Sequence, residues 1–173
     1  MRIAATTEDS IVDGDGLRFV VFTQGCPRNC PGCHNPQSQP FEGGKEVTVG
    51  ELFARVRDNP LCDGLTLSGG EPFAQAVQCA ELAKLVKGIG KTVWTYTGYT
   101  LENLQWQAAV YSAFEVPQLR PIGTAIGELL ANTDVLIDGE FIVARKSLRL
   151  KWKGSSNQRI WEQHESGEWR IVG

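Results

Sequence analysis

The sequence has 173 residues, of which 42% are hydrophobic and 21% charged, and its formal net charge is −3 at pH 7. This composition is that of an ordinary globular domain and excludes a wholly disordered or collagen-like chain, while the small negative charge excludes the broad basic surface of a nucleic-acid-binding protein. No apolar run approaches the about 20 residues of a membrane span, so we expect neither nucleic acid nor membrane among the partners.

The first half of the chain begins with a strand, a loop and a helix. Residues 17–23 are mostly apolar and β-rich, which predicts a buried strand. Residues 25–40 are dense in Gly, Pro, Asn and Cys, which is typical of a loop. A helix is expected at 48–58, where Thr48 and Glu51 have the spacing of a capping box.

Strands and helices alternate along the rest of the core. The expected elements are a strand at 64–67, a helix from 73 to 88, a strand at 91–96, a helix at 101–114, a connector at 116–123, a helix at 124–132 and a strand at 134–137. This alternation predicts parallel βαβ units in an α/β fold, as an open sheet or as part of a barrel.

The chain changes character after Phe141, where short strands are expected at 147–153, 158–163 and 169–172. We therefore expect a single domain over 1–173, with a core at about 14–141 and a C-terminal β region at about 142–173. A strand at 147–153 would place Arg149, Lys151 and Lys153 on one face. That face would either dock an acidic partner or form a solvated edge that discourages strand pairing.

Three of the five cysteines form a C-x3-C-x2-C cluster at Cys26, Cys30 and Cys33. The first residues of the chain lack a signal-peptide pattern, so we expect a cytoplasmic protein. In a reducing cytosol, clustered cysteines indicate metal binding or redox work. Thiolates select iron–sulfur clusters, zinc and cuprous ions. A [4Fe–4S] cluster usually takes four cysteines, so three would leave one iron open.

Two alternatives remain for the cluster, and both need a fourth protein ligand. A structural zinc site could use His34, but that residue directly follows Cys33, and His164 is remote. A four-cysteine electron carrier would need Cys62 or Cys79, which lie near or within regular elements and read as packed thiols.

The motifs resemble those of the radical S-adenosylmethionine (SAM) superfamily, and most closely its glycyl-radical-enzyme activases that act on anaerobic ribonucleoside-triphosphate reductase. The stretches that carry the resemblance are 13–18 (DGDGLR), 23–36 with the three cysteines, 67–72 (LSGGEP) and 154–160 (GSSNQRI). The resemblance implies a partial (βα) barrel of the radical SAM type with a short C-terminal β extension.

The resemblance also implies the chemistry. Cys26, Cys30 and Cys33 would hold three irons of a [4Fe–4S] cluster, and SAM would chelate the fourth. One electron, from a reduced flavodoxin- or ferredoxin-type donor, would cleave SAM to methionine and a 5′-deoxyadenosyl radical. That radical would take a hydrogen atom from a glycine of the reductase. Such chemistry belongs to the cofactors, while the protein binds and orients them.

Further site residues follow from the resemblance. Gly69, Gly70 and Glu71 would receive the methionine end of SAM, because two glycines permit close backbone approach and a helix start offers free N–H groups. A plain strand-to-helix turn is the alternative. Gly32 and His34, which flank Cys33, would lie against the adenine.

The ends of the third and fourth predicted strands carry polar residues. Thr95, Thr97 and Asp138 sit at or just beyond these ends, where ligands bind in parallel α/β sheets. Asp138 is the better candidate, either as an acceptor for the ribose hydroxyls or as a group that supports the residues in contact with the cofactor, although it could equally form a turn before Gly139. The segment 154–160 has no evident chemical role; its Ser and Asn side chains could bind the ribose or build a turn.

Two other functions remain open at this point. The chain could be a small radical SAM enzyme acting on a small molecule, similar to the deazaguanine synthases, or a non-catalytic metal-binding module. At 173 residues, a barrel is expected to be incomplete, and its open side would suit a protein loop better than an enclosed small molecule.

Overall fold

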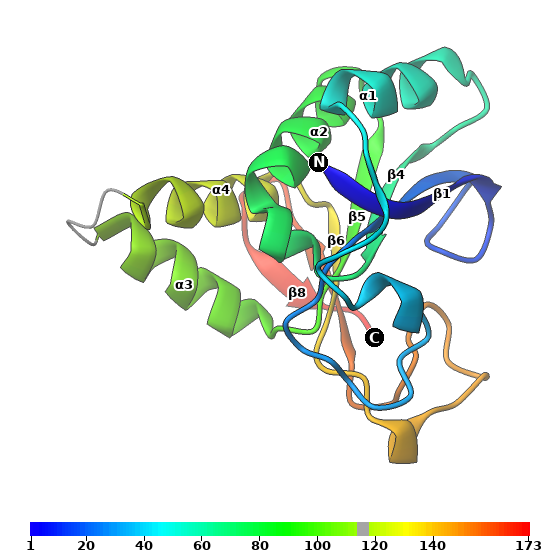
Figure 1. The fold of residues 1–173 in the computed structure, drawn as a ribbon, viewed down its shortest axis with the longest axis vertical. Coiled ribbons are helices and arrows are strands. Elements are labelled where there is room, and N and C mark those ends of the chain that lie inside the picture. The colour runs from blue at the N-terminus through cyan, green and yellow to red at the C-terminus, as the bar shows by residue number, and fades with distance from the viewer. Residues whose placement is uncertain (114–117) are drawn as a thin grey trace.

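The computed structural model describes residues 1–113 and 118–173 and shows one sheet with the strand order β3-β1-β2-β4-β5-β6-β7-β8 (Figure 1). Its four central strands are parallel: β2 (Arg18–Thr23), β4 (Gly64–Gly69), β5 (Thr92–Tyr96) and β6 (Val135–Asp138). The predicted α/β fold with parallel βαβ units is therefore confirmed.

Antiparallel strands extend the sheet on both sides. On one side lie β1 (Arg2–Ser10) and β3 (Lys45–Glu46), and on the other β7 (Arg159–Gln163) and β8 (Trp169–Ile171). The predicted strands at 158–163 and 169–172 are thus confirmed, and they continue the same sheet as the core.

The helices cover one face of the sheet (Figure 1). They are α1 (Val49–Asp58), α2 (Ala76–Gly88), α3 (Leu101–Ala113) and α4 (Arg120–Ala131), with 3-10 turns at Pro36–Ser38, Pro72–Gln75 and Val143–Arg145. The main core lies between these helices and the alternate strand residues that face them, such as Leu65, Leu67 and Leu136. Trp94, Ile137 and Ile160 form a smaller cluster on the other face.

Helix α1 begins where the sequence predicts. The Thr48 hydroxyl accepts a hydrogen bond from the backbone N–H of Glu51 (3.2 Å), and the Glu51 carboxylate accepts one from the backbone N–H of Thr48 (2.8 Å). This reciprocal capping box satisfies two backbone donors that the helix itself cannot pair.

Two predicted elements are wrong, and two strands, β1 and β3, were not predicted. Helix α4 begins at Arg120, inside the expected connector, because Pro121 is compatible with the first turn of a helix. The end of the helix expected at 101–114 and the start of the connector at 116–123 lie outside the described residues.

The second error concerns residues 147–153, which form turns instead of a strand and are anchored by a single bridge between Lys146 and Ser155. Trp152 has φ +61°, a left-handed conformation that interrupts extended pairing. Arg149, Lys151 and Lys153 therefore do not share a strand face. No helix in the described part of the chain combines the length and apolar character needed to cross a membrane.

Candidate functional site

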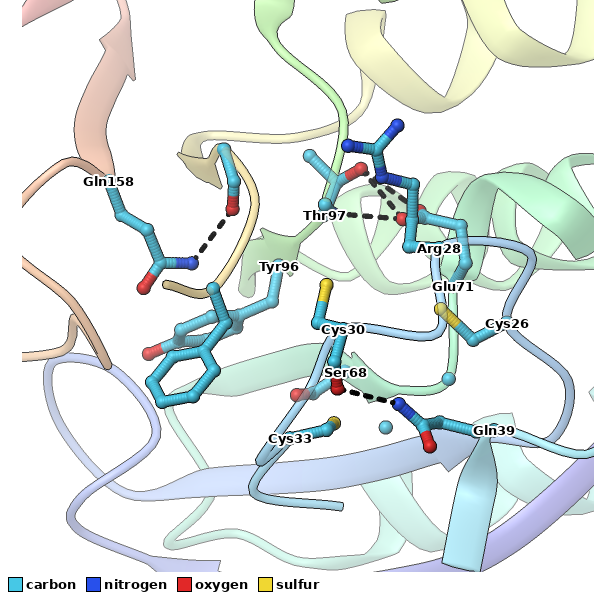
Figure 2. Close-up of a pocket in the computed structure, with 15 residues that line it drawn as sticks. Cys26, Arg28, Cys30, Cys33, Gln39, Ser68, Glu71, Tyr96, Thr97 and Gln158 are labelled. Atoms are coloured by element: carbon cyan, nitrogen blue, oxygen red, sulfur yellow. Dashed lines mark hydrogen bonds between the residues drawn. The ribbon is translucent and has the colours of Figure 1, made fainter. Parts of the chain in front are cut away.

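Loops that follow the four parallel strands surround one cavity of about 110 Å³ (Figure 2). The carboxyl edge of a parallel sheet is where such proteins bind ligands, since the loops there converge. The lining residues are Cys26, Arg28, Cys30, Cys33, Gln39, Ser68, Gly69, Gly70, Glu71, Tyr96, Thr97, Gly98, Gly139, Phe141 and Gln158.

The cysteine loop leaves β2 and is folded back on itself by backbone hydrogen bonds. Gly25 N–H donates to the Ser38 carbonyl (2.8 Å), and Cys26 N–H donates to the Gln39 carbonyl (2.9 Å). The buried Gln24 side chain donates to three carbonyl groups farther along the same loop, the shortest bond being 2.6 Å. These contacts hold the first cysteine in place without any metal.

All three thiols of the predicted cluster line this cavity. Burial raises the pKa of the Cys26 thiol, and the negative charge of Glu71 adds to the effect. Burial likewise raises the pKa of Cys30, with Glu140 adding to it. The metal-free protein therefore keeps these two thiols protonated at neutral pH, and metal binding would release their protons.

The donor set suits an iron–sulfur cluster. Within residues 1–113 and 118–173, no three His, Cys, Asp or Glu side chains converge closely enough to hold a single metal ion. A [4Fe–4S] cluster instead takes one thiolate on each iron, so its ligands stand apart around a shared volume. The three cysteine sulfurs are soft donors and likewise stand around one cavity, so they match the ligands of such a cluster.

The glycine turn after β4 is bonded directly to the start of the cysteine loop. Gly69 has φ +93°, and a Cβ on Gly70 would lie 2.4 Å from the Gly25 carbonyl oxygen. Gly70 N–H donates to the Thr23 carbonyl (2.7 Å), and Glu71 N–H donates to the Gly25 carbonyl (2.9 Å). Only glycine permits this approach of two backbones, so the turn and the cysteine loop form one unit.

Glu71 is fully buried beneath the cavity and holds the turn against the end of β5. Its carboxylate accepts hydrogen bonds from the backbone N–H groups of Phe73 (3.1 Å) and Gly98 (2.9 Å) and from the Thr97 hydroxyl (3.0 Å). Burial raises the pKa of Glu71 to about 7, against the opposing effect of these hydrogen bonds.

The residues that flank the third cysteine face the loop after β6. Gly32 has φ +69°, and a Cβ there would lie 2.6 Å from Cγ2 of Val143. The His34 ring packs on the Phe141 ring with 4.7 Å between centroids. His34 lines a second cavity of about 600 Å³, which shares Cys33 and Phe141 with the first.

Four of the predicted cofactor-binding residues do not line the cysteine cavity: Gly32, His34, Thr95 and Asp138. The Thr95 hydroxyl is buried and hydrogen-bonded to that of Thr133 (2.9 Å) on the helix side of the sheet. The buried Asp138 carboxylate accepts from Leu101 N–H (2.7 Å) and from Nε of Arg159 (2.9 Å). Both polar groups therefore already have partners within the protein.

Other residues reach the cavity that sequence reasoning did not single out. Tyr96 faces the side of the sheet opposite Thr95, and Gln158 comes from the 154–160 segment. The Gln158 amide accepts from Gly154 N–H (2.8 Å) and donates to the Gly139 carbonyl (3.0 Å). The segment thus builds a turn that ties the C-terminal region to the site, and its resemblance to the family was the only signal for it.

Arg28, which lies between the first two cysteines in sequence, was also missed. Its guanidinium makes an ion pair with Glu140 (3.2 Å) and stands 5.3 Å from the centre of the Tyr99 ring. No periodicity in the sequence distinguishes an arginine of this kind from a solvated one, because its partners come from distant loops.

The chain is similar to known proteins over nearly its whole length. The family of 4Fe–4S single cluster domains matches residues 12–161. The anaerobic ribonucleoside-triphosphate reductase-activating protein of Haemophilus influenzae is 31% identical over 159 residues, covering 87% of this chain and 90% of that protein. The chain belongs to this family of activating proteins.

Other members of the activating-protein family are similar to this chain to the same extent. The protein of Escherichia coli K12 is 31% identical over 87% of this chain and 91% of its own, and that of Enterobacteria phage T4 is 32% identical over 92% of each. A crystal structure of QueE from Escherichia coli is similar over 57% of this chain and 53% of that chain, with 18% identity and a TM-score of 0.47. The 12–161 match encloses every loop that lines the cysteine cavity.

Proposed function

We propose that this chain is a radical SAM activase, which cleaves SAM reductively at a [4Fe–4S] cluster and generates a glycyl radical on anaerobic ribonucleoside-triphosphate reductase. One observation carries the proposal: three cysteine thiols and a glycine turn line the same cavity in a chain of the activating-protein family. When bound, the cluster and SAM supply the electron and the radical that removes a hydrogen atom from the partner's glycine.

In this proposal Cys26, Cys30 and Cys33 hold three irons and leave the fourth free of protein ligands. Gly69 and Gly70 let the methionine end of SAM approach the backbone closely. A carboxylate has about four acceptor sites, and three donors already occupy the Glu71 carboxylate. Glu71 therefore positions the turn and keeps acceptor capacity for the ammonium group of SAM.

The adenine end of SAM is assigned to the second cavity, next to Gly32, Cys33 and His34. The His34 and Phe141 rings there provide apolar surface against which a base can pack.

The barrel-like fold, the electron donor and the location of the protein are proposed on the same grounds. The four parallel strands would form an incomplete (βα) barrel within a single domain that spans 1–173 and ends in a β extension. A reduced flavodoxin- or ferredoxin-type protein would supply the electron. The chain would work in the reducing cytoplasm, where its five free cysteines would stay reduced.

Anaerobic reconstitution with iron and sulfide tests the proposal. We expect about four irons per chain, as one cubane cluster requires, a spectral change on addition of SAM, and cleavage of SAM under reduction. Incubation of the reduced protein with the reductase should then give a glycyl-radical doublet in electron paramagnetic resonance.

Matched cysteine variants sharpen the test. Cys30→Ala removes one cavity thiol and should abolish SAM cleavage, whereas Cys79→Ala removes a thiol buried in the main core and should not. A single bound zinc with no response to SAM would favour a metal-binding module. SAM cleavage without any glycyl radical on an authentic reductase would favour a small-molecule substrate and refute the activase proposal.

A further inference from the structure

Two charged side chains stand beside the second cysteine of the cavity. The Cys30 thiol donates a hydrogen bond to Oε1 of Glu140 (3.8 Å), and Oε2 of Glu140 lies 3.2 Å from Nη2 of Arg28. Arg28 lines the cavity together with the three thiols (Figure 2). Neither charge has a role in the binding of the cluster or SAM proposed above.

The 154–160 segment holds the backbone that carries Glu140. The Asn157 side chain donates to the Glu140 carbonyl (2.8 Å), and the Gln158 side chain donates to the carbonyl of Gly139 (3.0 Å). These two hydrogen bonds fix the start of the loop after β6 against the cysteine loop. The Glu140 carboxylate is therefore presented to the thiol by the fold and not by a chance surface contact.

The Arg28 side chain is also held in place. Its guanidinium carbon lies 5.3 Å from the centre of the Tyr99 ring, a position that favours a cation. Its Nε is buried and has no hydrogen-bond partner among the described residues. Buried donors in folded proteins are nearly always paired, so Nε remains available to an acceptor that enters the cavity, such as a cluster sulfur.

The two charges bear on the reduction of a cluster in the cavity. Cysteine binds a metal as the thiolate, so the Glu140 carboxylate would then face a like charge at Cys30. Reduction by one electron adds a further negative charge and breaks no bond. A neighbouring carboxylate opposes that step and a neighbouring guanidinium favours it. Net charge and hydrogen bonds to the sulfurs are among the factors that set the potential of such clusters.

From these contacts we propose that Arg28 offsets the charge of Glu140 beside Cys30, and that the two side chains together set the midpoint potential of the cluster. This inference rests on the proposed function, because it requires a cluster on the three thiols. The single electron comes from the reduced donor protein named above, and the cluster is the group that is reduced.

Solvent limits the size of the effect. The side chains of Arg28 and Glu140 are 33% and 46% exposed, and water screens charges at such positions. We therefore expect removal of either charge to change the reduction equilibrium about three- to tenfold. A tenfold change corresponds to about 59 mV for one electron.

A redox titration of the reconstituted protein without SAM, followed by the paramagnetic signal of the reduced cluster, measures the midpoint potential. Arg28→Gln leaves the Glu140 charge uncompensated, so the potential should fall. Glu140→Gln leaves the Arg28 charge uncompensated, so the potential should rise. The variant with both substitutions carries neither charge and should return close to the wild-type potential. Each single variant tests the sign by itself if the other fails to fold.

Two further variants are controls. Arg28→Lys keeps a positive charge beside Glu140 and should stay closer to the wild-type potential than Arg28→Gln does. Arg170→Gln breaks an exposed ion pair with Glu168 (2.9 Å) in the hairpin of β7 and β8. Arg170 lines neither cavity, so this variant should leave the potential unchanged. About four irons per chain in each variant would show that the cluster has formed.

The signs of the shifts separate a role of charge from a role in structure. A merely structural ion pair would shift both single variants in the same direction, because each loses the same contact. That result, or equal potentials throughout, overturns the inference, and the activase proposal stands if the wild type still forms the glycyl radical. A loss of SAM affinity in Arg28→Gln with an unchanged potential would assign Arg28 to SAM and also overturn it. A wild type that binds no four-iron cluster would refute both.

Discussion

Gly70→Ala tests whether the cysteine loop depends on its backbone contact with the glycine turn. The added Cβ would lie 2.4 Å from the Gly25 carbonyl oxygen and 2.9 Å from that of Ser38, whereas real Cβ atoms essentially never come closer than 3.0 Å. The loop must therefore move by about 0.6 Å, which would stretch the bond from Glu71 N–H to Gly25.

The expected effects concern both stability and activity. Overpacking of this kind costs about 1–3 kcal/mol of unfolding free energy, and each kcal/mol lowers Tm by roughly 2–4 °C for a chain of this size. A misplacement of about 1 Å can cost roughly 100-fold in rate, so we expect SAM cleavage to fall about tenfold. Thermal unfolding of the metal-free protein and SAM cleavage by the reconstituted protein measure the two effects.

Gly50→Ala is the matched control, because it makes the same Gly→Ala change to the unfolded chain without the close contact. Both substitutions restrict the unfolded chain equally, but a Cβ on Gly50, in α1, meets no atom within 4 Å. Because alanine is favoured over glycine in a helix by about 0.8–1 kcal/mol, the control should be slightly more stable and fully active. If Gly70→Ala behaves like Gly50→Ala in both assays, the close contact between the two loops is unnecessary and our reasoning fails.

Three further predictions concern stability. Thr48→Ala removes the capping box of α1 and should cost about 1 kcal/mol in urea denaturation; an unchanged midpoint would contradict the capping role. Asp138→Asn weakens a buried ion pair with Arg159, whose side chain is 31% exposed. It should lower the free energy of unfolding by about 2–3 kcal/mol in the same assay, and an unchanged midpoint would show that the fold does not need this ion pair. Burial raises the pKa of Glu71 to about 7 from 4.5, so the metal-free protein should lose up to about 3 kcal/mol as pH rises from 4.5 through 7. Glu71→Gln should lack that share of the pH dependence, and parallel curves for the two proteins would refute the assignment.

Local sequence determined the elements whose stabilising contacts are local. The capping box at Thr48 and Glu51 is formed by neighbours in the chain, so its spacing alone located the start of α1. The mostly apolar run of β2 predicted a buried strand, and the apolar run of β6 predicted a further strand, because the strands of a parallel sheet are covered on both faces. The cysteine spacing and the glycine turn identified the chemistry that the site is proposed to perform.

Pairing with distant partners decided the rest. The polar β1 has no strand periodicity of its own and exists because β2 offers it an unpaired edge. Thr95 and Tyr96 are adjacent in sequence, yet only Tyr96 lines the cavity, because successive strand residues face opposite sides. Asp138 and Arg159 are separated by 21 residues and meet only through the pairing of β6 with β7. Sequence thus indicated which groups carry chemistry, whereas tertiary pairing determined which of them reach the cavity.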